Sequence, residues 1–313
     1  MPGIPPVWRR LLGSALRDYR QGLGYNLDEA AAILECDRSK ISRIETGERG
    51  IRPKELRELL TEYGVPAAEQ QALLAIAHRG RDSGWWLDYR DVLSAAAQDY
   101  VIMETAATQI LAYESNQVPD LLQTPAYMRA VAAADARYGS AEQRAHAVEV
   151  KRNRQRIVVA GRAPRLDFVV TEGALRQVVG PPRVMREQLR LLAELAEAGH
   201  AAALTDAASR PGGDPVPVSV TAPARPGLVA LRVLPFAAGA HAAAGSGPMT
   251  LLRFAEAPEI GVVHLAALSG GVSLESREEI ARYLRTFTQL GAAALAPPRS
   301  AQLIRDIAAG FDR

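Results

Sequence analysis

The stretch DRSKISRIETGERG, residues 37–50, decides how the N-terminal part of this chain is interpreted. It opens with an aspartate that can cap a helix, and it places basic and hydroxyl side chains around Ile41 and Ile44. These isoleucines are three residues apart, so they share one face of a helix. The pattern predicts a short helix with a buried apolar face and an outward polar face. The outward face carries Arg38, Ser39, Ser42 and Arg43, with Lys40 at its edge.

A second helix is expected immediately before this stretch. Asn26 can cap the segment LDEAAAIL, residues 27–34, and Glu29 stands where a capping box requires an acid. A turn at Glu35 and Cys36 then separates the two helices. Two helices joined by such a short turn form the helix-turn-helix pattern, whose second helix enters the major groove of DNA.

Further helices are expected on both sides of this pair. Apolar residues recur at helical spacing between residues 12 and 23, and Pro53 can open a fourth helix. A fifth helix is expected at about residues 67–79. Residues 1–80 are therefore predicted to form an all-α, five-helix, helix-turn-helix DNA-binding domain.

The outward face suggests how DNA would be read. Arg38 and Arg43 are candidates for reading bases, because a guanidinium group can donate two hydrogen bonds to guanine. Ser39, Lys40 and Ser42 are further candidates on the same helix. Between residues 38 and 57, seven basic residues stand against three acidic ones, although the whole chain has a net charge of only +2. The basic residues are Arg38, Lys40, Arg43, Arg49, Arg52, Lys54 and Arg57.

Phosphate contacts are expected beside this helix. Arg49 and Arg52 follow it in a loop and are suited to fixing the register on the DNA backbone. Asn26 and the backbone amides at the start of its helix could hold another phosphate. From spacing alone, the alternative is a solvated basic helix inside a helical interaction module.

The remaining sequence predicts two more regions. Residues 81–164 have helical patterns and are expected to form a helical linker or subdomain. Residues 165–313 contain strand-like runs separated by helices, which predicts an α+β regulatory domain with a small, mostly antiparallel sheet. Residues 199–227 are rich in Ala, Pro and Gly without helical periodicity, and we expect a mobile loop there.

Several classes of protein are disfavoured. One cysteine, Cys36, cannot form an intramolecular disulfide or a cysteine metal cluster. The five histidines lack metal-ligand spacing, and no nucleophile motif is present, so we expect no enzyme, no metal and no cofactor. The chain shows no secretory signal and no apolar run of about 18 residues, which favours a cytoplasmic protein.

The N-terminal sequence resembles the lambda-repressor-like (Cro/XRE) helix-turn-helix family. The resemblance covers about residues 10–80 and is carried by "LR..R" in the first helix, by "SKISRIETG" and by the turn spacing. It implies a transcriptional regulator in which Arg20 pairs with Glu45 beneath the DNA-binding surface. Leu27 departs from the family, because many members have a glutamine at this DNA-facing position.

The rest of the chain resembles the C-terminal domain of actinobacterial antitoxin-like regulators. Matching stretches include "WWLDYRDVL", "KRNRQ", "TEGALRQVVG" and "GPMTLLRF". The resemblance implies a regulator that often acts with a small partner protein encoded nearby. We expect a homodimer on double-stranded DNA, whose C-terminal region dimerises and senses a partner or a ligand. The alternatives are an antitoxin-like protein-binding module and a small-molecule sensor.

Overall fold

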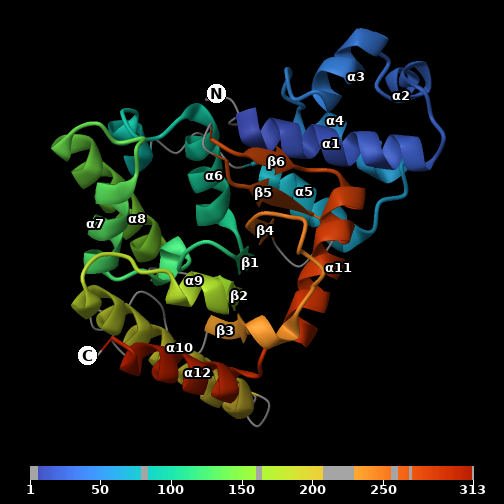
Figure 1. Cartoon of the computed structure of the whole chain (residues 1–313). Coiled ribbons are helices and arrows are strands. Elements are labelled where there is room, and N and C mark those ends of the chain that lie inside the picture. The colour runs from blue at the N-terminus through green and yellow to red at the C-terminus, as the bar shows by residue number, and fades with distance from the viewer. Residues whose placement is uncertain are drawn as a thin grey trace. The chain divides into compact units, whose positions relative to one another are not determined.

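The computed structural model describes residues 6–78, 84–159, 164–206, 229–254, 260–267 and 270–311, as Figure 1 shows. The chain forms two compact units. The first consists of Met1–Trp85, Leu251–His264 and Val272–Leu284. The second consists of Trp86–Thr250, Leu265–Gly271 and Arg285–Arg313. The expected domain boundaries after residues 80 and 164 remain predictions.

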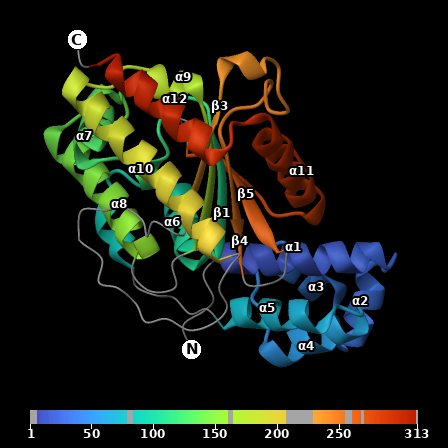
Figure 2. The same cartoon turned by 90° about the horizontal axis from the view of Figure 1, so that it is seen from below.

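Five α-helices lie within residues 6–78 of the first unit, and Figure 2 shows them as one bundle. They are α1 (Pro6–Gly22), α2 (Leu27–Ile33), α3 (Arg38–Glu45), α4 (Pro53–Glu62) and α5 (Ala67–Ala77). In the turn between α2 and α3, Glu35 has a φ of 46°. This left-handed conformation costs a residue other than glycine about 1–2 kcal/mol. The predicted helical fold of this region is confirmed.

Capping residues explain where α2, α3 and α4 begin. The Asn26 side chain accepts hydrogen bonds from the backbone amides of Asp28 and Glu29, at 2.8 and 3.0 Å. The Glu29 carboxylate accepts one from the Asn26 amide at 2.7 Å, which completes the capping box. Asp37 accepts from the Ser39 amide at 2.7 Å, and Pro53 opens α4. These local interactions satisfy backbone donors that no helical carbonyl can reach.

The apolar faces of α2 and α3 meet as the sequence predicts. Ile41 and Ile44 are buried, with 1% and 2% of their surfaces exposed. Ala31 on α2 is also buried, and Leu34 at its end is half-buried. Burial of this seam fixes which side of α3 faces outward.

Two glycines allow α1 to pass very close to α3. A Cβ atom on Gly13 would lie 2.4 Å from the carbonyl oxygen of Ile44 and 2.6 Å from that of Glu45. Gly47, just after α3, has a φ of 75°, and a Cβ there would lie 2.8 Å from the backbone of Arg10. Both positions therefore exclude a side chain for steric reasons.

Within the described residues, six strands form one mixed sheet in the order β3-β2-β1-β4-β5-β6. They are β1 (Gln109–Glu114), β2 (Arg165–Thr171), β3 (Val229–Leu234), β4 (Met249–Arg253), β5 (Gly261–Leu265) and β6 (Val272–Leu274). Within the second unit, β1 pairs with β2, and β2 with β3, in parallel. The predicted C-terminal sheet is confirmed, but it also includes β1 from residues 81–164, and β2 and β3 pair in parallel although mostly antiparallel pairing is expected. Their connections are long and carry helices, as parallel strands require.

Further α-helices and short 3-10 helices, labelled η, precede, separate or follow these strands in the sequence. They are η1 (Trp85–Tyr89), α6 (Ala95–Ala106), η2 (Asp120–Leu122), α7 (Pro125–Ala134), α8 (Ala141–Val159), α9 (Glu172–Arg176), α10 (Pro182–Asp206), η4 (Phe236–Ala238), α11 (Arg277–Ala293) and α12 (Pro297–Ala309). Figures 1 and 2 both show α10 and α12 side by side. None of the helices in the described ranges has the length and hydropathy of a membrane span.

Two expectations about secondary structure need correction. Residues 109–114 were expected to be helical, but they form β1, whose four central residues are all buried. A strand buried on both faces lacks polar alternation, so its pattern resembles that of a buried helix. The expected loop at 199–227 also differs, because α10 continues to Asp206. Residues 207–227 of that loop lie outside the described residues.

Gly13→Ala is expected to destabilise the protein by about 1–3 kcal/mol, because the added methyl group collides with backbone atoms that cannot move independently. Urea unfolding of the full chain measures the change. Gly22→Ala is the matched control in the same helix, since a Cβ at Gly22 meets nothing within 4 Å. An equal loss of stability in both variants would contradict the close approach of α1 and α3.

Candidate nucleic-acid interface

The outward face of α3 is solvent-accessible. Arg38, Ser39 and Arg43 are exposed, and Ser42 is half-buried. Arg38 lies 3.7 Å from Asp28, but both side chains are more than 60% exposed. Surface pairs of this kind contribute about 0–1 kcal/mol, so Arg38 can exchange its partner at little cost. Arg43 donates from Nε to the carbonyl oxygen of Ser39 at 3.3 Å.

Lys40 lies in a different environment from the exposed arginines. Its Nζ atom is 2.9 Å from Oε1 of Glu55 on α4, and only 18% of its side chain is exposed. Burial raises the pKa of Glu55, but hydrogen bonds from Lys40 and the Arg52 amide outweigh this effect and lower it. Lys40 therefore joins α3 to α4, and less of its charge is available to DNA than we expected.

The segment after α3 presents two more arginines. Arg49 and Arg52 are both exposed. The Arg49 amide donates to the carbonyl oxygen of Arg43 at 2.9 Å, which ties the segment to the end of α3. The Arg52 amide donates to the Glu55 carboxylate at 3.4 Å at the start of α4. Both backbones are thus held while the side chains remain accessible, and their phosphate contacts stay a prediction.

The phosphate site at the start of α2 stays a prediction, but capping occupies part of it. The amides of Asp28 and Glu29 already donate to the side chain of Asn26, and the Asn26 amide donates to Glu29. Capping uses these three donors, and two carboxylates lie in the same turn. Asn26 can still offer its side-chain NH₂ group to a phosphate, because capping uses only its oxygen. Leu27 is half-buried and provides no polar side chain there.

Arg20 and Glu45 form a buried, two-point ion pair beneath α3. Arg20 Nε and Nη2 lie 2.6 and 2.9 Å from the two carboxylate oxygens of Glu45. Arg20 Nη1 also donates to the carbonyl oxygen of Tyr25 at 2.6 Å. The exposed fractions of Arg20 and Glu45 are 8% and 5%. The hydrogen bond to Glu45 raises the pKa of Arg20 against the opposing effect of burial.

A second arginine on α1 was missed by the sequence analysis. Arg17 Nη2 donates to the carbonyl oxygen of Glu45 at 3.0 Å, and its Nε lies 3.7 Å from the Glu45 carboxylate. Its spacing could have revealed this contact, because Gly13, Arg17 and Arg20 lie on one face of a helix. Glu45 is thus bound by two arginines of α1.

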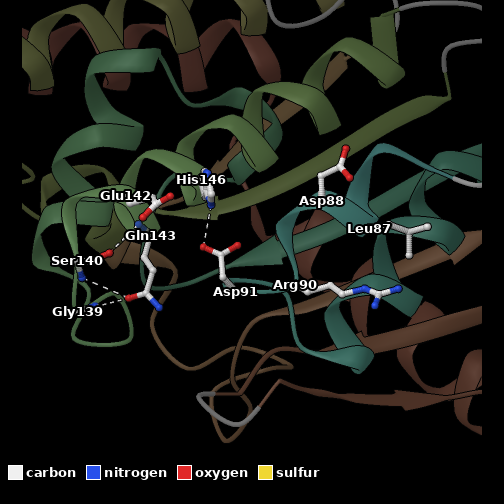
Figure 3. Close-up of a pocket in the computed structure, with 9 residues that line it drawn as sticks. All are labelled: Leu87, Asp88, Arg90, Asp91, Gly139, Ser140, Glu142, Gln143 and His146. Carbon is white, nitrogen blue, oxygen red and sulfur yellow. Dashed lines mark hydrogen bonds and ion pairs between the residues drawn. The ribbon is translucent and has the colours of Figure 1, made fainter.

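The second unit contains a surface groove of about 580 Å³, shown in Figure 3. Two of the residues that line it, His146 on α8 and Asp91, are in contact, with 2.8 Å between Nδ1 and Oδ2. The Tyr89 ring packs edge-on against the His146 ring. This pair was not predicted, because its members are 55 residues apart. Within the described ranges, no group of three or more His, Cys, Asp or Glu residues could hold a metal ion.

A charged network also lies in the second unit. Arg154 makes a two-point pair with Glu104 at 2.7 and 2.8 Å, and it reaches Asp120 at 2.9 Å. Lys151 lies 2.8 Å from the same aspartate. Burial raises the pKa of Asp120, but Lys151 and Arg154 outweigh it and hold that pKa well below its usual range. By contrast, burial and the charge of Asp120 raise the pKa of Glu114, at the end of β1, to about 8.

Two families match the chain. A helix-turn-helix domain matches residues 11–73. A domain of unknown function, DUF5753, matches residues 97–204 and 220–306, which together make up more than half of the chain. No curated protein and no solved structure matches at a significant level. The helix-turn-helix assignment is confirmed, while the Cro/XRE subtype and the antitoxin-like relationship stay predictions.

Glu45→Ala is expected to cost about 3–5 kcal/mol of folding free energy, because it leaves the buried guanidinium group of Arg20 without its partner. Urea unfolding of the full chain is the measurement. Glu58→Ala provides the control, since its pair with Lys54 is exposed and should be worth less than about 1 kcal/mol. Equal unfolding midpoints for Glu45→Ala and wild type would refute the supporting role of the pair.

Glu114→Gln is expected to weaken the dependence of stability on pH. Between the usual carboxyl pKa and pH 8, Glu114 is ionised in the unfolded chain but protonated in the folded protein. The folded state then binds the extra proton, so this group makes stability fall as pH rises through that window. Melting temperatures from pH 5.5 to 8.5 test this expectation. Parallel curves for wild type and Glu114→Gln would show that Glu114 titrates normally.

Proposed function

Because the chain belongs to the DUF5753 family and carries a helix-turn-helix domain, we propose that it is a sequence-specific DNA-binding transcriptional regulator of the Cro/XRE type. The observation that carries this proposal is the exposed face of α3. That face presents Arg38, Ser39 and Arg43, while Ile41 and Ile44 seat the helix from behind. A helix so presented has the form that a major groove accepts.

Recognition divides between base and backbone contacts in this proposal. Arg38 and Arg43 donate to guanine O6 and N7, and each two-point contact is worth about 1–3 kcal/mol of discrimination. Ser39 and Ser42 contact base edges or nearby phosphates. Arg49, Arg52 and the side-chain NH₂ of Asn26 bind phosphates and fix the register. Lys40 acts through Glu55 by holding α3 against α4.

The second unit supplies dimerisation and regulation in this proposal. A two-fold dimer would read half-sites about one helical turn apart, roughly 34 Å. The surface groove beside His146 and Asp91 is the place at which a small molecule would bind in this proposal. We propose no catalytic activity and place the protein in the cytoplasm with the DNA. A small partner protein encoded nearby remains part of the proposal through the sequence resemblance alone.

Arg43→Ala is expected to lose specificity at one base pair of the target. The full-length protein first selects duplexes from a random-sequence pool, and affinities for the selected duplex are then measured by fluorescence anisotropy. Arg43→Ala should lower the specific affinity by about 1–3 kcal/mol and relax the preference at a single position. Arg52→Ala should instead weaken binding to all sequences and reduce the salt slope by about one.

Arg305→Ala is the charge-matched control, because this exposed arginine pairs with Glu197 on the second unit. It should leave the selected sequence and the affinity unchanged. Wild-type protein that selects no sequence, and binds only in a salt-sensitive, sequence-blind manner, would defeat the proposed function.

A further inference from the structure

The start of α11 is anchored on α1 and α5 within the first unit, although more than 200 residues separate Arg277 from the residues that it contacts. The Arg277 backbone amide donates to the Asp18 carboxylate at 2.9 Å. The Arg277 guanidinium group lies over the Tyr19 ring, with 4.1 Å from Cζ to the centroid. The same group hydrogen-bonds to the Tyr19 hydroxyl and pairs with the carboxylate of Glu69 on α5.

Two further contacts hold α1, one from Phe254 after β4 and one from Glu275 just before α11. The rings of Trp8 and Phe254 pack edge-to-face at a centroid distance of 5.2 Å, and both side chains are buried. Arg10 Nε lies 3.6 Å from the carboxylate of Glu275, two residues before Arg277. We call the contacts made by Phe254, Glu275 and Arg277 the α1 clamp.

Another part of the surface of α1 holds the recognition helix. Gly13, Arg17 and Arg20 face α3 and reach the backbone or carboxylate of Glu45. At 100° per residue, these three positions centre about 135° around α1 from Trp8 and Tyr19, whereas Arg10, which pairs with Glu275, lies on the same side as Arg17. The backbone of Arg10 also lies against Gly47 at the end of α3. Helix α1 is therefore packed between the clamp and α3.

We propose that Arg277 is a positioning residue for DNA recognition, through which the segment from β6 to α11 fixes α1 and thereby the placement of α3. This inference rests on the proposed function and names how that site is regulated. An event that releases Arg277 lowers specific DNA affinity without changing any group that touches DNA.

The Arg277 guanidinium group makes several contacts of the clamp at once. Glu69 is 6% exposed, so removing the guanidinium group leaves a buried carboxylate without its cation, which is strongly unfavourable. The Arg277 side chain is 32% exposed and remains within reach of solvent. A partly released arginine would lose the Glu69 pair and the Tyr19 contact together. Release of Arg277 therefore removes both contacts, because the same guanidinium group makes them.

Placement of α3 matters because base contacts and phosphate contacts must form simultaneously. The two kinds of contact come from α3 and from the segment after it, and both lie against α1 through Glu45 and Gly47. If α1 is free to shift, DNA binding must also order these elements, and the cost appears as lost affinity. The number of phosphates contacted does not change, so the salt dependence stays the same.

The test uses the full chain and a duplex that wild-type protein has selected from a random pool. Arg277→Ala should lower the affinity for that duplex about tenfold at a temperature well below melting, with an unchanged salt slope. Amide hydrogen exchange should become faster in α1 and α3. Arg282→Ala removes the same charge from the same helix, where the side chain is 56% exposed, and should stay within twofold of wild type.

Each outcome decides between the alternatives. The positioning role is overturned if Arg277→Ala binds the selected duplex with wild-type affinity. It is also overturned if the salt slope falls by one, because Arg277 would then be a phosphate contact. A fall in melting temperature alone, with affinity unchanged, also overturns it. If Arg277→Ala does not fold, Arg277→Lys and Glu69→Gln must show smaller losses of affinity in the same direction. Failure of wild type to select any sequence overturns the proposed function itself, and this inference with it.

Discussion

The buried pair of Arg20 and Glu45 is the interaction on which the DNA-binding face depends. A buried ion pair is weak evidence for net stability, because desolvation of both charges offsets their attraction. Here, however, all three donor nitrogens of Arg20 are used, two by Glu45 and one by the carbonyl oxygen of Tyr25. Its geometry is satisfied at only one placement of α3 against α1. The pair therefore specifies orientation, and the Gly13 crossing makes that orientation possible.

The local parts of this arrangement could be predicted from sequence. Helices α2 and α3 begin directly after their capping residues Asn26 and Asp37, and α4 begins at Pro53, because each start is set by residues within three positions of it. The seam of Ile41 and Ile44 follows from helical spacing alone. The outward face of α3 then follows from the seam, and Arg38 and Arg43 are exposed as the spacing predicts. These features need no knowledge of distant residues.

Features that depend on distant residues could not be predicted in this way. Lys40 was expected at the edge of the DNA-facing surface, but Glu55, fifteen residues later, holds it against α4. Strand β1 lacks the polar alternation of a half-exposed strand, because its four central residues, which point to both faces of the sheet, are all buried. The contacts of Arg277 with α1 and α5 have no local signature, since a single arginine at a helix start is ordinary in sequence. Only the fold brings these groups together.

The charges of the first unit affect two separate properties, namely the long-range attraction to DNA and the discrimination between base sequences. Of the seven cations between residues 38 and 57, Arg38, Lys40 and Lys54 have carboxylate partners. In the described part of the chain, no carboxylate pairs with Arg43, Arg49 or Arg52. A net charge of +2 provides little long-range attraction for DNA, so non-specific binding should be weak at physiological salt. Discrimination then depends on a few arginines whose fork-shaped donors act only at short range and correct orientation. This makes the exact placement of α3, and so every contact that holds α1, a determinant of function.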